Sequence, residues 1–110
     1  MEINQASDIN EEFLMTLLCT VGEAKSSFMQ AMLEARLKNF DQSYEMIAIG
    51  DEALANVHKR QTSLIGFDEG TGKVPMTLIL THIQDHIMTT MLCRDLALEI
   101  IELRKEFSGE

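Results

Sequence analysis

Apolar side chains recur every three or four residues along most of this chain, which is the period of an amphipathic helix. The recurrence is found in three segments, which span about residues 8–37, 40–65 and 75–107. Long helices joined by short connections lie antiparallel to their neighbours. The pattern therefore predicts an all-α fold, a three-helix up-down-up bundle formed by one domain that spans residues 1–110.

Residues that start and stop helices mark the expected boundaries. Asp8 and Glu11 have the spacing of a capping box at the start of the first helix. A glycine-rich stretch, residues 66–73, is the one clear loop, and it places the end of the second helix near Ile65. Pro75 follows the loop directly, so we expect it in the first turn of the third helix.

Two apolar stripes, rather than one, follow the third segment when its residues are placed at about 100° per position. The first stripe is formed by Met76, Leu80, Ile83, Ile87, Met91, Leu98 and Ile101. The second stripe lies nearly opposite and contains Leu78, His82, Asp85, Thr89, Leu92, Leu96 and Leu103. The first two helices can cover only one stripe, and the other would expose a larger apolar patch than monomers usually carry. We therefore predict that third helices of several subunits pack together, in a number that the pattern does not fix.

Charge and cysteine content exclude several classes of function. Asp and Glu outnumber Lys and Arg by 18 to 9, and the resulting net charge of −9 would repel nucleic acid but suits contact with basic protein surfaces. Cys19 and Cys93 form neither a disulfide framework nor a metal-binding pair. The sequence contains no recognisable signal peptide or membrane-spanning stretch, so we expect a cytosolic protein without membrane insertion.

His82, Asp85 and His86 lie one helical turn apart in the second stripe or next to it. A lone histidine in such a place is usually structural. Three polar groups at a seam between subunits are harder to explain in that way, because each costs desolvation energy unless it has a partner. We therefore interpret the cluster as a functional site.

The chemistry of the cluster follows from its residue types. An imidazole is largely neutral at cytosolic pH and can act as a nitrogen nucleophile, and phosphoryl transfer needs mainly positioning and charge stabilisation. His82 is the candidate nucleophile, and His86 is the nearest group that could orient it or offset phosphate charge. Copies of Asp85 brought together at the seam would require protonation or a hard divalent cation, whose preferred ligands are carboxylate oxygens.

Other motifs fit less well. A zinc protease helix would need Glu where Ile83 stands, a P-loop would need Gly at Phe67 and a hydroxyl at Val74, and a two-component phosphotransfer domain would need Lys at position 86. The remaining alternative to phosphoryl transfer is a metal-binding helical adaptor or structural bundle.

The segment His82-Ile-Gln-Asp-His86-Ile-Met-Thr-Thr90, preceded by Met76-Thr-Leu-Ile-Leu80, resembles the lactose/cellobiose-type IIA proteins of the bacterial sugar phosphotransferase system. The segments Gly22-Glu-Ala-Lys-Ser26 and His58-Lys-Arg-Gln-Thr62 support the resemblance, which extends over almost the whole chain. Ile83, where relatives usually carry a smaller residue, and Lys25, in place of the more usual Arg, depart from the pattern.

The resemblance implies a homotrimer of three-helix subunits with the third helices near the axis. Each subunit would accept phosphate on His82 from the phosphocarrier HPr and pass it to a cysteine of a IIB protein. The phosphate would finally reach a β-linked disaccharide of the cellobiose, chitobiose or lactose class that enters through a membrane IIC permease. The class of activity is that of a phosphotransferase component.

The resemblance also assigns roles to individual residues. Asp85 would bind one divalent ion per trimer, which we expect to be Mg²⁺, and His86 and Gln84 would shape the phosphorylation site. His58 and Gln61 match positions in the second helix close to that site, although His58 is equally well explained as a histidine at the edge of the core.

Overall fold

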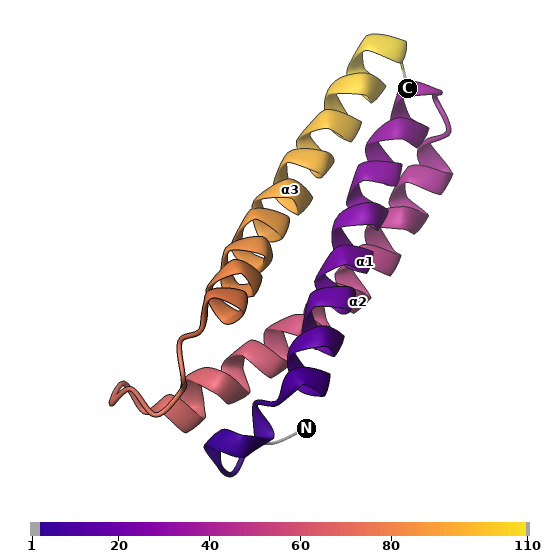
Figure 1. The fold of residues 1–110 in the computed structure, drawn as a ribbon. Coiled ribbons are helices and arrows are strands. Elements are labelled where there is room, and N and C mark those ends of the chain that lie inside the picture. The colour runs from indigo at the N-terminus through magenta and orange to yellow at the C-terminus, as the bar shows by residue number, and fades with distance from the viewer. Residues whose placement is uncertain (1–2, 110) are drawn as a thin grey trace.

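The computed structural model describes residues 3–109 and contains three long helices in an antiparallel arrangement (Figure 1). A short 3₁₀ turn, η1 (Ala6–Asp8), precedes α1 (Glu11–Arg36), α2 (Phe40–Asp68) and α3 (Leu78–Ser108). No strand occurs between residues 3 and 109, so the predicted all-α class and up-down-up order are confirmed. None of these helices is long and apolar enough to cross a lipid bilayer.

The first helix begins three residues later than predicted, because Asn10 rather than Asp8 is its N-cap. The side chain of Asn10 accepts a hydrogen bond from the backbone N–H of Phe13 at 2.9 Å. The Asp8 carboxylate turns back and accepts from the backbone N–H groups of Asn4 and Gln5 at 2.9 and 3.1 Å. The proposed capping box between Asp8 and Glu11 is therefore wrong.

The loop before α3 is shorter than predicted at one end and longer at the other. Helix α2 continues through Gly66 to Asp68, whose carboxylate accepts from the backbone N–H of Val74 at 2.9 Å and so closes the loop. That hydrogen bond is the main reason why the pKa of Asp68 is lowered. Pro75 lies outside α3, because the side chain of Thr77 accepts from the N–H of Leu80 and starts the helix there.

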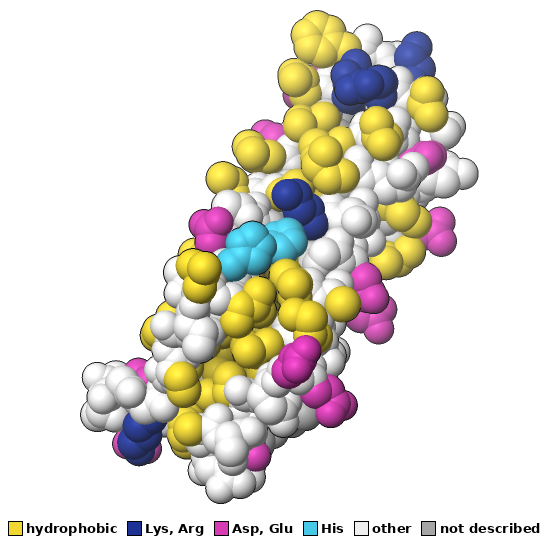
Figure 2. Space-filling model, viewed as in Figure 1, with side chains coloured by type: hydrophobic (Ala, Val, Ile, Leu, Met, Phe, Trp, Pro, Cys, Tyr) yellow, Lys and Arg dark blue, Asp and Glu magenta, His cyan; other side chains and the backbone are white. Residues whose placement is uncertain are grey.

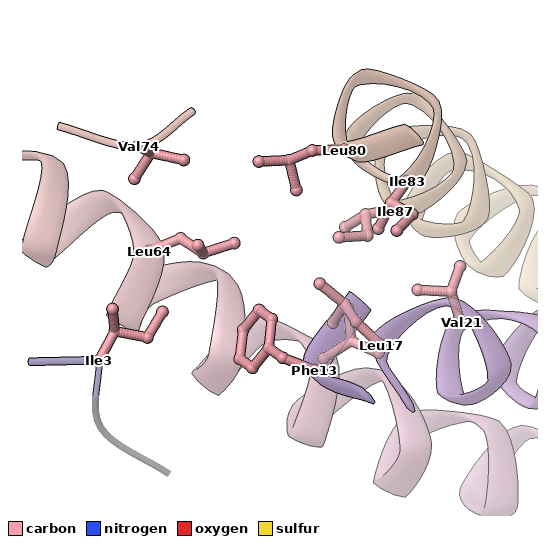
Figure 3. Packing of buried hydrophobic residues seen from close by; sticks show 10 residues of the cluster. Ile3, Phe13, Leu17, Val21, Leu64, Val74, Leu80, Ile83 and Ile87 are labelled. Carbon is pink, nitrogen blue, oxygen red and sulfur yellow. The ribbon is translucent and has the colours of Figure 1, made fainter. Parts of the chain in front are cut away.

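Helix α1 packs against both other helices, whereas α2 and α3 contact each other less. Figure 3 shows the core near the start of α1, where Phe13, Leu17 and Val21 face Ile83 and Ile87 of α3. A second buried cluster fills the other half of the bundle and consists of Ala24, Phe28, Ala31, Ala35, Phe40, Ile47, Ala97 and Ile101.

An ion pair supplements the sparse contact between α2 and α3. The guanidinium of Arg94 donates to both carboxylate oxygens of Asp51, from Nε at 2.6 Å and from Nη2 at 3.2 Å. This pairing is the main cause of a raised pKa for Arg94. The two-pronged geometry fixes the separation of the helices more firmly than a single contact would.

The two stripes of α3 have opposite fates in the single subunit. Leu80, Ile83, Ile87 and Ile101 of the first stripe are buried. Met76 and Met91 are exposed instead, because Met76 precedes the helix and Met91 borders a cavity beside α2. The apolar members of the second stripe are all more than half exposed: Leu78, Leu92, Leu96 and Leu103.

The subunit is rod-shaped, with extents of 54 × 22 × 20 Å. Its accessible surface is 6900 Å², whereas a compact monomer of this mass exposes about 6,100 Å². A single rod of three helices thus exposes more surface than a compact monomer of the same mass.

Candidate functional site

The histidine pair of α3 lies on a surface bordered by apolar side chains. His82 is exposed and His86 is half-buried, with their ring centroids 6.3 Å apart and the ring planes tilted by 45°. Figure 2 shows histidine side chains gathered in the middle of one face, with a basic side chain beside them and apolar side chains above and below. At this separation, a group attached to the outer ring is within reach of the inner one.

A buried hydroxyl supports the inner ring. Thr90 is fully buried, and its Oγ1 lies 3.3 Å from Nδ1 of His86. His82, His86 and Thr90 follow one another at intervals of four residues, and each interval advances about 40° around the helix. The three side chains therefore lead from the exposed stripe of α3 into its core face. Sequence analysis assigned no role to Thr90.

Helix α1 contributes a basic residue beside the pair. Gly22, Lys25 and Ser26 line a groove of about 510 Å³ that is shared with His86. The charge of Lys25 also acts on Cys93 of α3, whose thiol pKa is raised by burial and lowered in smaller part by that charge. From the sequence, this segment of α1 was noted only because it supports the family resemblance. The fold places Lys25 along the same groove as His86.

Gln84 and His58 lie on the other flank of α3. The amide nitrogen of Gln61 donates to Oε1 of Gln84 at 2.9 Å, which links α2 to α3. His58 is exposed and shares with Gln61 a small cavity that Ile87 and Met91 close from the side of α3. Within one subunit, therefore, Gln84 and His58 are not brought together with the pair on the side of α1.

Asp85 is exposed on the second stripe and projects away from the bundle core. Among residues 3–109, no three His, Cys, Asp or Glu side chains of one chain are grouped closely enough to hold a metal ion. Carboxylate oxygens suit a hard cation such as Mg²⁺. The donor chemistry of Asp85 thus fits such an ion only where further copies of the same residue join it.

Fold and site together define a small all-helical domain that presents an exposed histidine from the first half of a long helix. The family model described as "PTS system, Lactose/Cellobiose specific IIA subunit" matches residues 12–105. The chain belongs to this family and is a IIA component of a sugar phosphotransferase system.

Individual relatives agree with this assignment. The N,N'-diacetylchitobiose-specific EIIA component of Escherichia coli K12 is 40% identical over 99 residues, which cover 90% of this chain and 85% of that protein. The crystal structure of a cellobiose-specific enzyme IIA from Bacillus anthracis superimposes with a TM-score of 0.85 at 29% identity, covering 91% of this chain and 92% of the other. The IIA(Chitobiose) solution structure determined in complex with HPr, from Escherichia coli, gives 0.78 at 38% identity over 89% and 95%.

Proposed function

We propose that the protein is a phosphohistidine carrier, in which His82 takes a phosphoryl group from phosphorylated HPr and passes it to a cysteine of a IIB protein. The observation that carries this proposal is the exposed His82 ring with the His86 ring 6.3 Å behind it. The similarity to a IIA protein solved with HPr supports the choice of donor. The final acceptor is a β-linked disaccharide that enters the cytoplasm through a IIC permease, and the relay operates on the cytoplasmic side.

Transfer to His82 takes place directly between phosphorylated HPr and this protein. A lone pair on the ring nitrogen of His82 forms a bond to phosphorus while the bond between phosphorus and its atom on HPr breaks, and the bonding electrons stay on HPr. The second transfer reverses the roles, because a IIB thiolate then forms the new bond and the His82 nitrogen leaves. His82 is the acceptor because its ring is exposed, whereas His86 is half-buried and has Nδ1 occupied.

Groups around the pair stabilise the added negative charge. The His86 ring and the Lys25 ammonium border the same groove and attract phosphoryl oxygens. Gln84 and His58 remain predicted contributors to the site, and within one subunit they face α2.

The assembly that we propose is a homotrimer around α3. The exposed second stripe supports it, because packing against copies would cover Leu92 and Leu96. Three Asp85 carboxylates would then meet near the axis and hold one divalent ion, for which we propose Mg²⁺. This ion would neutralise the carboxylates and take no part in the phosphoryl step.

The decisive experiment is intact-mass analysis after incubation with phosphorylated HPr. We expect the wild type to gain one phosphoryl group and His82→Ala to gain none, because the nucleophile is lost. Glu99→Gln, which alters an exposed side chain further along α3, is the control and should still accept phosphate. Phosphate on His82→Ala would show that the site is wrong, and an unmodified wild type would favour the alternative, a metal-binding adaptor without phosphoryl transfer.

A further inference from the structure

Thr90 is the one hydroxyl-bearing residue in the row of α3 that faces the bundle core. Its fully buried neighbours in that row, Ile83, Ile87 and Ala97, are apolar. Burying a hydroxyl costs free energy unless it forms a hydrogen bond. Among the described residues, the partner found for the Thr90 hydroxyl is Nδ1 of His86 at 3.3 Å. The hydrogen bond to His86 therefore offsets the cost of burying the Thr90 hydroxyl, and it also restrains the His86 ring.

The direction of this hydrogen bond follows from the surroundings. A threonine in a helix often donates to the carbonyl four residues earlier, which for Thr90 is the carbonyl of His86. The hydroxyl of Thr89 donates to that carbonyl oxygen at 3.2 Å, whereas among the described residues the contact found for the Thr90 hydroxyl is the one to Nδ1 of His86. Nδ1 of His86 is then the acceptor available to the Thr90 proton, in the tautomer whose Nδ1 carries no hydrogen. A ring that accepts at Nδ1 carries its own proton on Nε2.

We propose that Thr90 is a positioning residue, which holds His86 in the tautomer and orientation that present Nε2–H to a phosphoryl group on His82. This inference rests on the proposed function for its purpose, although the tautomer itself does not. Without the hydroxyl, the half-buried ring could turn over or move its proton to Nδ1, and a lone pair would then face the phosphoryl oxygens. A donor aimed in advance at developing charge needs no reorganisation during transfer.

The same hydrogen bond explains why the two rings have different tasks. The Nδ1 lone pair of His86 is occupied by Thr90, so this nitrogen is not available to attack phosphorus. The ring of His82 is exposed rather than held against the core, so it remains the accessible nucleophile. The spacing of four residues thus assigns reaction, support and restraint to successive turns of α3.

Thr90→Val tests the proposal, because valine keeps the shape of threonine and removes only the hydroxyl. Thr90→Ser restores the hydroxyl, and Thr89→Val is the matched control, since Thr89 bonds only to the backbone carbonyl of residue 86. The first measurement is the ¹⁵N chemical shifts of the His86 ring in the unphosphorylated protein. The second is the rate of phosphoryl gain from phosphorylated HPr, with thermal unfolding used to confirm that each variant is folded.

We expect the wild type, Thr90→Ser and Thr89→Val to show a His86 ring with an accepting Nδ1 and a protonated Nε2. Thr90→Val should shift both nitrogens toward the averaged values of a ring that exchanges between tautomers. Phosphoryl transfer to Thr90→Val should slow by about five- to tenfold, as expected for the loss of one positioned hydrogen bond.

Unchanged ¹⁵N shifts of the His86 ring in folded Thr90→Val would overturn the proposal. Wild-type shifts that show the ring proton on Nδ1 rather than on Nε2 would overturn it as well. Changed shifts with an unchanged transfer rate would overturn the positioning role. If the wild type itself accepts no phosphate, the proposed function fails, while the ring shifts still decide whether Thr90 controls His86.

Discussion

The side chains of the site differ in how much freedom their surroundings leave them. The His82 ring is exposed and can reach a visiting protein, the His86 ring is half-buried, and Thr90 is enclosed by the core. Freedom therefore decreases from the group that reacts to the group that positions. Asp85 belongs to neither role, because it lies on the exposed stripe and, among residues 3–109, is part of no group of three metal-ligating side chains.

Asp85 leads to a prediction about metal dependence. In the proposed trimer, chelation with EDTA should lower the thermal unfolding temperature of the wild type, because three carboxylates lose their shared cation and repel one another. Asp85→Asn should remove that repulsion and make the unfolding temperature insensitive to EDTA and Mg²⁺. Asp95→Asn alters another exposed aspartate of α3 and should behave as the wild type does. Equal EDTA sensitivity in both variants would contradict the metal assignment.

Residue types and spacing in the sequence were sufficient to propose His82, His86 and Asp85 as one cluster, and the fold places the two rings together. No role could be assigned to Thr90 from the sequence, because a threonine among apolar residues does not by itself indicate a specific hydrogen bond. A signal existed, since Thr90 continues the four-residue spacing of the histidines. The groove with Lys25 depends on how α1 and α3 pack, so spacing within one helix could not predict it.

At the scale of the helices, close packing between α1 and α2 depends on a glycine. A Cβ atom at Gly50 would lie 2.5 Å from Cε1 of Phe28, whose ring is fully buried. At Gly66, also within α2, an added Cβ would meet no atom within 4 Å. The same residue type thus serves a packing contact at one position and has no such task at the other.

Gly50→Ala should therefore destabilise the protein by about 1–2 kcal/mol, because overpacking outweighs the gain in helix propensity. Gly66→Ala provides the control and should be neutral or stabilising by up to about 1 kcal/mol, since only the propensity changes. Urea unfolding of the two variants and the wild type measures both free energies. Similar stability of Gly50→Ala and Gly66→Ala would show that the Phe28 ring can move aside.

The helices themselves were predictable from periodicity, and their ends were not. Two acceptors near the first helix compete for backbone N–H groups, and Asn10 rather than Asp8 caps α1. Before α3, the hydrogen bond from Val74 to Asp68 holds the chain in a loop, so the helix begins after Thr77 rather than at Pro75. Both outcomes depend on which local hydrogen bond wins, and spacing alone does not rank the candidates.

At the scale of the whole molecule, fold and assembly are separate problems. The core of the rod is closed by α1, α2 and the first stripe of α3, and it uses none of the second stripe. Leu96 of that stripe is 51% exposed, about as much as Ile49 of α2 at 47%. The two side chains are therefore similarly exposed, but only Leu96 is part of the continuous apolar stripe along α3. A substitution at Leu96 can therefore disturb association without disturbing the bundle.

Leu96→Glu should convert the proposed trimer into a folded monomer. Association would lose the burial of the exposed half of three leucine side chains, about half of the roughly 1.5–3 kcal/mol that full burial of each is worth, and would bring three new carboxylates together near the axis. Ile49→Glu exchanges a similarly exposed side chain on α2 and should leave the oligomer intact. Light scattering after size-exclusion chromatography gives the mass of each variant, and circular dichroism gives its helix content.

The wild-type unfolding temperature should also rise with protein concentration, whereas that of Leu96→Glu should not, because only an associating protein is stabilised by its own concentration. A monomeric wild type, or a Leu96→Glu protein of unchanged mass, would mean that another surface covers the exposed stripe.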